Sequence, residues 1–213
     1  MEHEPDQLKR CRGAFSLVEL LTVVAIMAVL TVLTGPPLAQ ALRGGRLSLS
    51  TDTVEGVLEQ ARLSALSRQR PVEVRFYAYS DPTLPGKPGG VHALQSFIVA
   101  DSGLCSPISP PKVLADRTVI TTNSSLTSLW SLPAAVPQAS IPRVGLAYEC
   151  RSFRFLPDGG TSLSSSGSAT PWCLTVLSAS DDQSGAVKPP RNFATVVIDP
   201  LTGTRKTYRP SLR

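Results

Sequence analysis

The sequence predicts an α+β fold in which a long N-terminal transmembrane helix packs on a C-terminal antiparallel β-sheet domain. Three observations support this prediction. The run from Phe15 to Thr34 is apolar or weakly polar except at Glu19, and a membrane-spanning helix needs about 20 such residues. An amphipathic pattern of helical period follows this run. Beyond Pro71 the hydrophobic period changes to two, and turn residues separate short strand-like segments.

The charges around the apolar run predict its orientation. Lys9, Arg10 and Arg12 precede the run and no basic residue lies within it, so the N-terminus should remain in the cytoplasm. We therefore expect a single-pass inner-membrane protein whose C-terminal domain lies in the periplasm or in an extracytoplasmic assembly. A chain of 213 residues with a net charge of +5 and 19 prolines has room for one modest, loop-rich domain beyond this anchor.

Glu19 is the most informative residue of the apolar run, because a charge in such a run costs free energy and usually marks function. It lies in the segment Phe15-Ser16-Leu17-Val18-Glu19-Leu20-Leu21, directly after Ala14. This segment resembles the class III signal of type IV pilin-like proteins, which is cleaved before the helix. Numbering from Phe15 makes Glu19 the fifth residue and Pro36 the twenty-second, as in pilins. The resemblance implies cleavage between Ala14 and Phe15 by a prepilin peptidase, followed by N-methylation of Phe15.

Three alternatives to this signal remain open. Cleavage after Gly13 would leave Ala14 first and move the glutamate one position out of register. A conventional secretory signal would be cleaved near Ala39-Gln40-Ala41, but its apolar core is usually only about 7–15 residues long. An ordinary membrane anchor with an incidental glutamate is the third. Cleavage at Phe15 is preferred because it aligns both the glutamate and the proline.

Proline should mark the end of the first helix. Gly35, Pro36 and Pro37 are expected to kink it, because proline lacks an N–H donor and clashes with the preceding turn. The resulting boundaries are a leader peptide at 1–14, a transmembrane helix at 15–37, an amphipathic helix at 38–70 and an extracytoplasmic β-rich domain at 71–213.

The amphipathic helix should place one face on the sheet. Its apolar stripe at helical spacing consists of Leu47, Val54, Val57, Leu58, Ala61 and Ala65. The polar residues Asp52, Glu55, Glu59 and Arg62 should then lie in water.

The first strand should follow Pro71, where Val72, Val74 and Phe76 alternate with Glu73, Arg75 and Tyr77. This alternation predicts a half-buried strand with one polar face. Residues 81–90 should form a loop. Further strands are predicted at 94–100, 112–122, 148–156, 172–178, 194–199 and 204–208, with turns at 157–160 and 199–203.

Three globular stretches narrow the resemblance to the minor-pseudopilin branch called GspH/FimT. They are the helix-to-strand junction ending in Arg70-Pro71-Val72-Glu73-Val74, the segment Phe153-Arg154-Phe155-Leu156-Pro157-Asp158-Gly159, and the terminal hairpin around Val197-Ile198-Asp199. The combination is also similar to the prepilin-like "Verru_Chthon cassette protein D" family.

The resemblance implies a structural function. The chain would be a minor pilin or pseudopilin subunit of a type IV pilus-like or type II secretion filament. Its partners would be the prepilin peptidase, other pilin or pseudopilin subunits and an inner-membrane assembly platform. Glu19 of an entering subunit would pair with the Phe15 amine of its neighbour, because an unpaired charge in an apolar environment is costly.

No pattern in the sequence predicts an enzyme or a cofactor. His92 is the only histidine after the leader, and we expect it to be an exposed polar residue. The chain has no Gly-x-Ser-x-Gly elbow and no zinc or calcium spacing. We therefore predict no catalytic residues, no metal site and no cofactor.

Cysteines and basic residues leave two further questions open. After removal of Cys11, three cysteines remain, of which Cys150 and Cys173 are the candidate disulfide pair because both occur in strand-like segments. Three buried thiols are the alternative. The basic C-terminal residues Arg205, Lys206, Arg209 and Arg213 could contact a nucleic-acid backbone, as in FimT-type pilins that take up DNA. The alternative is a solvated basic edge strand that discourages aggregation.

Overall fold

The computed structural model describes residues 16–80, 89–135, 141, 144–145, 147–165, 171–183 and 185–210, without the side chains of 32–41. The chain divides into two units, Met1–Leu42 and Arg43–Arg213. The predicted cleavage site at Ala14 and Phe15 lies outside the described residues, as does Arg213.

One helix, α1 (Leu17–Arg68), contains both of the segments that were predicted to be helical. Pro36 and Pro37 lie inside it, so the expected kink at these prolines stays a prediction. The helix ends where Gln69 adopts a positive φ of 52°, which is the usual left-handed residue after a helix C-terminus.

The predicted fold class is wrong in its transmembrane helix. Within the residues that the structure describes, no helix is long and apolar enough to cross a bilayer. The predictions of a membrane protein, of the inner membrane and of the periplasm rested on that helix, and they are corrected with it.

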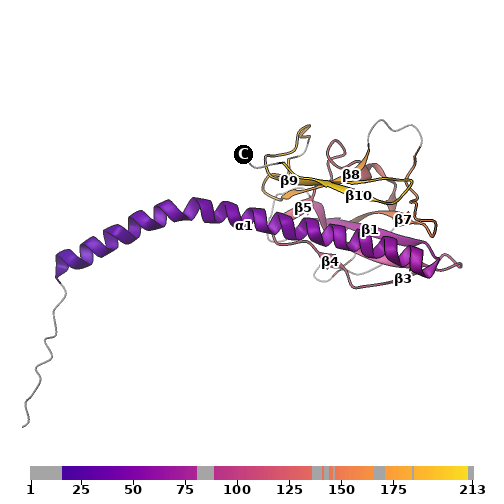
Figure 1. The fold of residues 1–213 in the computed structure, drawn as a ribbon, viewed down its shortest axis with the longest axis horizontal. Helices are drawn as coiled ribbons and strands as arrows, with labels where there is room; N and C mark the ends of the chain where they lie inside the picture. The colour runs from indigo at the N-terminus through magenta and orange to yellow at the C-terminus, as the bar shows by residue number, and fades with distance from the viewer. Residues whose placement is uncertain are drawn as a thin grey trace, which may run out of the picture. The chain divides into compact units, whose positions relative to one another are not determined.

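The unit Arg43–Arg213 is built on an antiparallel sheet, which has ten strands in the described residues (Figure 1). Their bounds are β1 (Val72–Tyr79), β2 (Gly90–Val99), β3 (Cys105–Pro107), β4 (Lys112–Val113), β5 (Thr118–Ile120), β6 (Ala134–Ala135), β7 (Glu149–Phe155), β8 (Trp172–Ser178), β9 (Phe193–Ile198) and β10 (Arg205–Tyr208). A short 3₁₀ helix, η1 (Ser128–Ser131), precedes β6.

The order across the sheet is β10-β9-β8-β5-β2-β1-β7-β6. The central strand β2 pairs with β1 along its full length, and its other side is shared by three short strands, β3, β4 and β5. The chain therefore leaves and rejoins the sheet several times between residues 100 and 120. Part of this segment contacts α1: Leu114 joins the core beneath the helix, and the Ala115 N–H donates to the Ser50 hydroxyl at 2.9 Å.

The predicted apolar stripe of α1 is confirmed. All six of its residues are buried, and they join one core with side chains of the long strands: Leu47, Val54, Val57, Leu58, Ala61, Ala65, Val72, Val74, Phe76, Leu94, Phe153, Leu174 and Val196. This is the helix-on-sheet packing that buries one stripe and one face. It fixes the C-terminal part of α1 against the sheet (Figure 1).

The six later strand predictions are confirmed as elements, with two differences. The segment 112–122 forms two short strands, β4 and β5, and β2 begins at Gly90, inside the predicted loop. The turn predicted at 199–203 is confirmed between β9 and β10. Its Gly203 has a φ of 61°, and a Cβ there would approach the carbonyl oxygen of Gly159 to 2.6 Å, so this turn requires glycine.

Candidate functional site

The N-terminal unit presents Glu19 among exposed apolar side chains. Ser16 precedes α1, and its carbonyl oxygen accepts a hydrogen bond from the backbone N–H of Leu20 at 3.1 Å. Glu19 is the acidic residue of the first turn and is exposed, where a carboxylate is favoured by the helix dipole. The exposed apolar residues around it are Leu17, Val18, Leu20, Leu21, Val23, Val24, Ile26, Met27, Val29 and Leu30.

The second group of predicted site residues lies on the edge strand β10 and, for Arg209, directly after it. Residues 205, 207 and 209 meet the polar face of α1, and we call these contacts the helix–hairpin seam. Arg205 forms an ion pair with Glu59, and the Thr207 hydroxyl donates to Glu55. Arg209 donates to the Ser48 hydroxyl at 2.9 Å and pairs with Asp52 at 3.4 Å.

The prediction that the polar face of α1 lies in water holds for Asp52, which is exposed, and is wrong for Glu55, Glu59 and Arg62, which are half-buried. Asp52, Glu55 and Glu59 face the terminal strand, and Arg62 donates to the carbonyl oxygen of Thr202 at 3.3 Å. Two of the candidate nucleic-acid contacts, Arg205 and Arg209, are therefore held by helix carboxylates. Lys206 alternates to the other side of β10 and is exposed.

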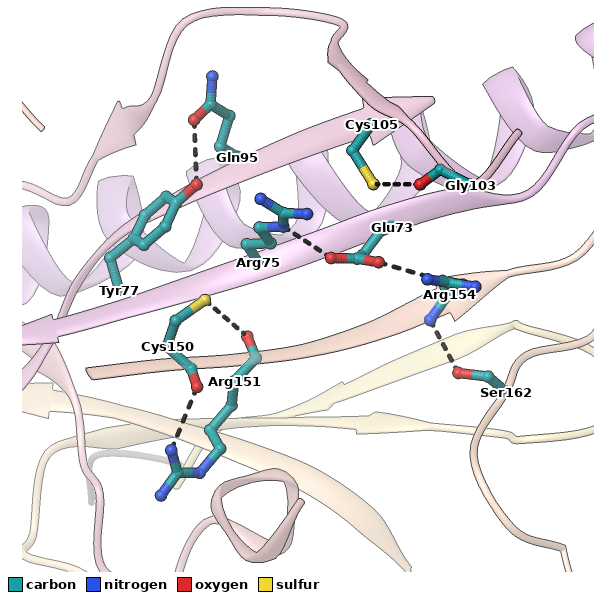
Figure 2. A network of polar contacts seen from close by, with 10 residues as sticks. All are labelled: Glu73, Arg75, Tyr77, Gln95, Gly103, Cys105, Cys150, Arg151, Arg154 and Ser162. Carbon is teal, nitrogen blue, oxygen red and sulfur yellow. Dashed lines mark hydrogen bonds and ion pairs between the residues drawn. The ribbon is translucent and has the colours of Figure 1, made fainter. Parts of the chain in front are cut away.

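The third group was missed as a site, because its residues were assigned to the solvated face of the first strand. Glu73 accepts a hydrogen bond from Arg75 Nε at 2.6 Å and one from Arg154 Nε at 3.0 Å (Figure 2). The side chains of Glu73 and Arg75 are only 7% and 6% exposed. The Arg75 guanidinium also lies over the Phe97 ring, 4.3 Å from its centroid. We call Glu73, Arg75 and Arg154 the buried triad; its buried pair is Glu73 and Arg75, whereas Arg154 lies at the rim with its side chain 47% exposed.

The arrangement around Arg75 compensates for its burial. Burial acts to lower the pKa of Arg75, but the hydrogen bond and the negative charge of Glu73 outweigh it and raise the pKa above its ordinary value. Arg75 thus stays charged at neutral pH. Glu73 balances the charge of buried Arg75, and the second guanidinium, that of Arg154, is half exposed to water.

Next to the triad, Tyr77 anchors a second small core on the same face. Its hydroxyl donates to Gln95 Oε1 at 3.1 Å, and the Gln95 amide donates to the carbonyl oxygen of Ser109 at 2.9 Å. Tyr77 packs edge-on against Tyr148, with ring centroids 4.9 Å apart, and contacts a cluster that includes Ile141 and Cys150. Burial raises the pKa of Tyr77 well above its ordinary value, so it acts as a neutral hydrogen-bond donor.

The candidate disulfide is not formed. Cys105, Cys150 and Cys173 are free thiols. Cys150 lies in β7 and Cys173 in β8, and β5, β2 and β1 separate these strands in the sheet. The Cys150 thiol contacts the Arg151 carbonyl oxygen at 3.8 Å, whereas that of Cys173 contacts the Leu126 carbonyl oxygen at 3.6 Å. Burial raises the pKa of Cys150 to about 11, so this thiol is a poor nucleophile at neutral pH.

His92 was predicted to be exposed, and this is wrong. It is buried in β2 with its ring centroid 4.9 Å from that of Tyr79, because β2 extends four residues farther toward its N-terminus than the sequence indicated. In the parts of the chain that the structure describes, no group of three His, Cys, Asp or Glu residues is placed to hold a metal ion. The predictions of no metal, no cofactor and no catalysis stay predictions.

These sites consist of ion pairs, hydrogen bonds and packed side chains. The buried Cys150 thiol is protonated at neutral pH. One feature of the sequence could have predicted that the triad is buried. The segment from Val72 to Tyr79 contains aromatic residues, which favour burial in strands. No family model, characterised protein or solved structure matches this chain.

Proposed function

We propose that this protein is a structural subunit of a helical filament, of the kind formed by minor pilins and pseudopilins. The observation that carries the proposal is the set of exposed apolar side chains from Leu17 to Leu30 with one carboxylate, Glu19, among them. The resemblance of residues 14–21 to the pilin-like signal agrees with it.

The exposed apolar side chains of the N-terminal unit follow one another along α1 from Leu17 to Leu30. Monomeric proteins rarely expose contiguous apolar patches larger than a few hundred Å², and larger ones usually mark contact sites. Each large side chain that a partner covers would contribute about 1.5–3 kcal/mol. A like helix from another subunit offers a matching surface, as in helical bundles.

Glu19 gives this packing its register. Its carboxylate would be buried when the apolar residues around it are covered, and a buried charge requires an ionic partner. In the proposed filament that partner is the free amine of Phe15 on an adjacent subunit, produced by a prepilin peptidase. The pair forms only when two subunits are staggered correctly, so misplaced subunits are rejected.

The first test is the mature N-terminus. The chain is co-expressed with a prepilin peptidase and the purified product is analysed by mass spectrometry. A product beginning at N-methylated Phe15 agrees with the proposal. A product beginning at Leu42, or an unprocessed Met1, would contradict it.

The second test is assembly of variants at Glu19. Glu19→Gln keeps the size of the side chain and removes its charge, so we expect processing to continue while co-purification with other pilin-like subunits falls at least tenfold. Asp101→Asn is the matched control, because it removes an exposed acid from the C-terminal unit. Normal assembly of Glu19→Gln would overturn the role of this carboxylate.

A further inference from the structure

We propose that the C-terminal unit contains a binding site for a small tetrahedral oxyanion, either phosphate or a small phosphomonoester. The site is a cavity lined by three arginines, Arg43, Arg46 and Arg117, together with Ser178, Ser180 and Asn192. This inference is independent of the proposed filament function.

Residues far apart in the sequence form the cavity. Arg43 and Arg46 come from α1, Arg117 from the turn before β5, and Ser178 from the last position of β8. The pairing of Thr118 with Ser178 aligns the last two segments. With the segment that carries Asn192, four parts of the chain bring nitrogen and hydroxyl donors to one cavity.

The charge of the cavity is positive. Among the described residues, neither Arg43 nor Arg117 has an ion-pair partner, and Arg46 reaches Asp116 only at 3.9 Å, with side chains 44% and 68% exposed. The other acid nearby is Asp181, which accepts a hydrogen bond from the Ser180 hydroxyl at 3.0 Å. Three guanidinium groups thus face two carboxylates, and guanidinium groups with hydroxyl and amide donors are the usual ligands of phosphate.

Arg117 occupies an unusual backbone conformation. Its φ is 60°, in the left-handed region where glycine is favoured and other side chains are strained. Its carbonyl oxygen accepts a hydrogen bond from the Ala179 N–H at 2.9 Å, which ties the turn to the segment that carries Ser178 and Ser180. Glycine would suit this backbone conformation better than arginine. A role for the Arg117 guanidinium in the cavity explains why an arginine is present.

The volume of the cavity limits the ligand. It measures about 130 Å³, whereas pockets for drug-sized molecules measure about 300–1,000 Å³. One water takes about 30 Å³ of liquid volume, so the cavity holds a few waters or one small oxyanion. Nucleotides and larger ligands could place only their phosphate group in it.

The test is a titration with inorganic phosphate and, separately, with glycerol 3-phosphate, in which chloride is replaced at constant ionic strength. The readouts are the Tm of the full chain and the NMR shift of the Asn192 side-chain amide. A ligand that binds only the folded state raises the Tm in a saturable way. Saturation by phosphate alone would indicate a free ion, and saturation by both would indicate that the cavity admits the ester.

Two variants remove guanidinium groups without endangering the fold. Arg117→Gly places glycine at the positive φ, and Arg43→Ala changes an exposed residue. We expect each to weaken phosphate binding at least tenfold, while Lys112→Ala, which removes an exposed cation from β4, leaves it unchanged. Absence of saturable binding by either probe, or equal weakening by Lys112→Ala, would overturn the proposal.

Discussion

The buried triad and the helix–hairpin seam pair the same chemical groups in two different environments. In the triad, Glu73 and Arg75 are 7% and 6% exposed, and the carboxylate accepts from two arginines. In the seam, Glu59 and Arg205 are 36% and 24% exposed, and the Nε atom of Arg205 has no hydrogen-bond partner in the described residues. The Glu73–Arg75 pair is buried on the sheet. The Glu59–Arg205 pair is partly exposed and joins the edge strand β10 to α1.

This difference teaches that burial, more than the number of ion pairs, sets the consequence of removing a charge. Water screens an exposed pair and solvates whichever partner is left behind. In a buried pair, water cannot solvate the charge that remains. Removing one partner therefore lowers the free energy of unfolding by more than the pair itself contributes. The triad should therefore be sensitive to single substitutions, and the seam should be tolerant of them.

The largest expected effect is that of Glu73→Ala. It leaves the Arg75 guanidinium buried without its carboxylate, and we expect the free energy of unfolding to fall by about 3–5 kcal/mol. Chemical denaturation measures this loss. The double variant Glu73→Leu, Arg75→Met should recover much of it, because apolar residues of similar volume can replace a buried pair at little cost. A single-variant loss below about 1 kcal/mol would break the contrast between the two regions.

Burial of Cys150 should also make the free energy of unfolding depend on pH in the alkaline range. Burial raises the pKa of the Cys150 thiol to about 11, whereas an unfolded thiol titrates near about 8.5. Between these values the unfolded state loses its proton first, so stability falls as pH rises, by at most about 3 kcal/mol from this group. Below about pH 7 both states keep the proton, so the contribution is complete and the slope vanishes.

The measurement is a series of denaturation curves from pH 7 to 11, on the protein and on Cys150→Ala. The variant should show a shallower alkaline decline than the wild type. As a second readout, Cys150 should react with iodoacetamide at pH 7.5 more slowly than the half-buried Cys105. Equal rates would show that the face around Tyr77 and Cys150 admits solvent.

A smaller effect is expected in the seam. Arg205→Ala should lower the free energy of unfolding by about 1 kcal/mol, since the pair is partly screened. The coupling between Arg205→Ala and Glu59→Ala in a double-mutant cycle should be of the same size and should shrink at high salt. A coupling above about 3 kcal/mol would place the seam with the triad and remove the distinction.

The helix stripe and the seam show which parts of the structure could be predicted from the sequence. The stripe from Leu47 to Ala65 was identified correctly, because helical periodicity is a local property of the chain. The seam was not, because Glu59 and Arg205 are 146 positions apart and neither segment carries a sign of the other. The hairpin turn at Gly203 was predictable, but the element against which β10 would fold was not.

The burial of the triad was not predicted, for a different reason. The alternation of Val72, Val74 and Phe76 with Glu73, Arg75 and Tyr77 assigned the residues to the correct faces of the strand. What the pattern lacks is information on whether a second layer covers the polar face, here provided by residues such as Ser109, Ile141 and Tyr148. Similarly, Cys150 and Cys173 both occupy strands as predicted, but the strand order that separates them is a non-local property.

The smallest effect sets the scale for the others. Arg70 and Asp101 form a 3.0 Å ion pair that is geometrically as good as the Glu73–Arg154 contact, yet Asp101 is 88% exposed. Asp101→Asn should change the free energy of unfolding by less than about 0.5 kcal/mol, because water replaces the lost partner. Denaturation at low and high salt checks this value. If the substitution cost as much as Glu73→Ala, distance and not burial would decide the strength of these pairs, and the reason for separating the triad from the seam would be lost.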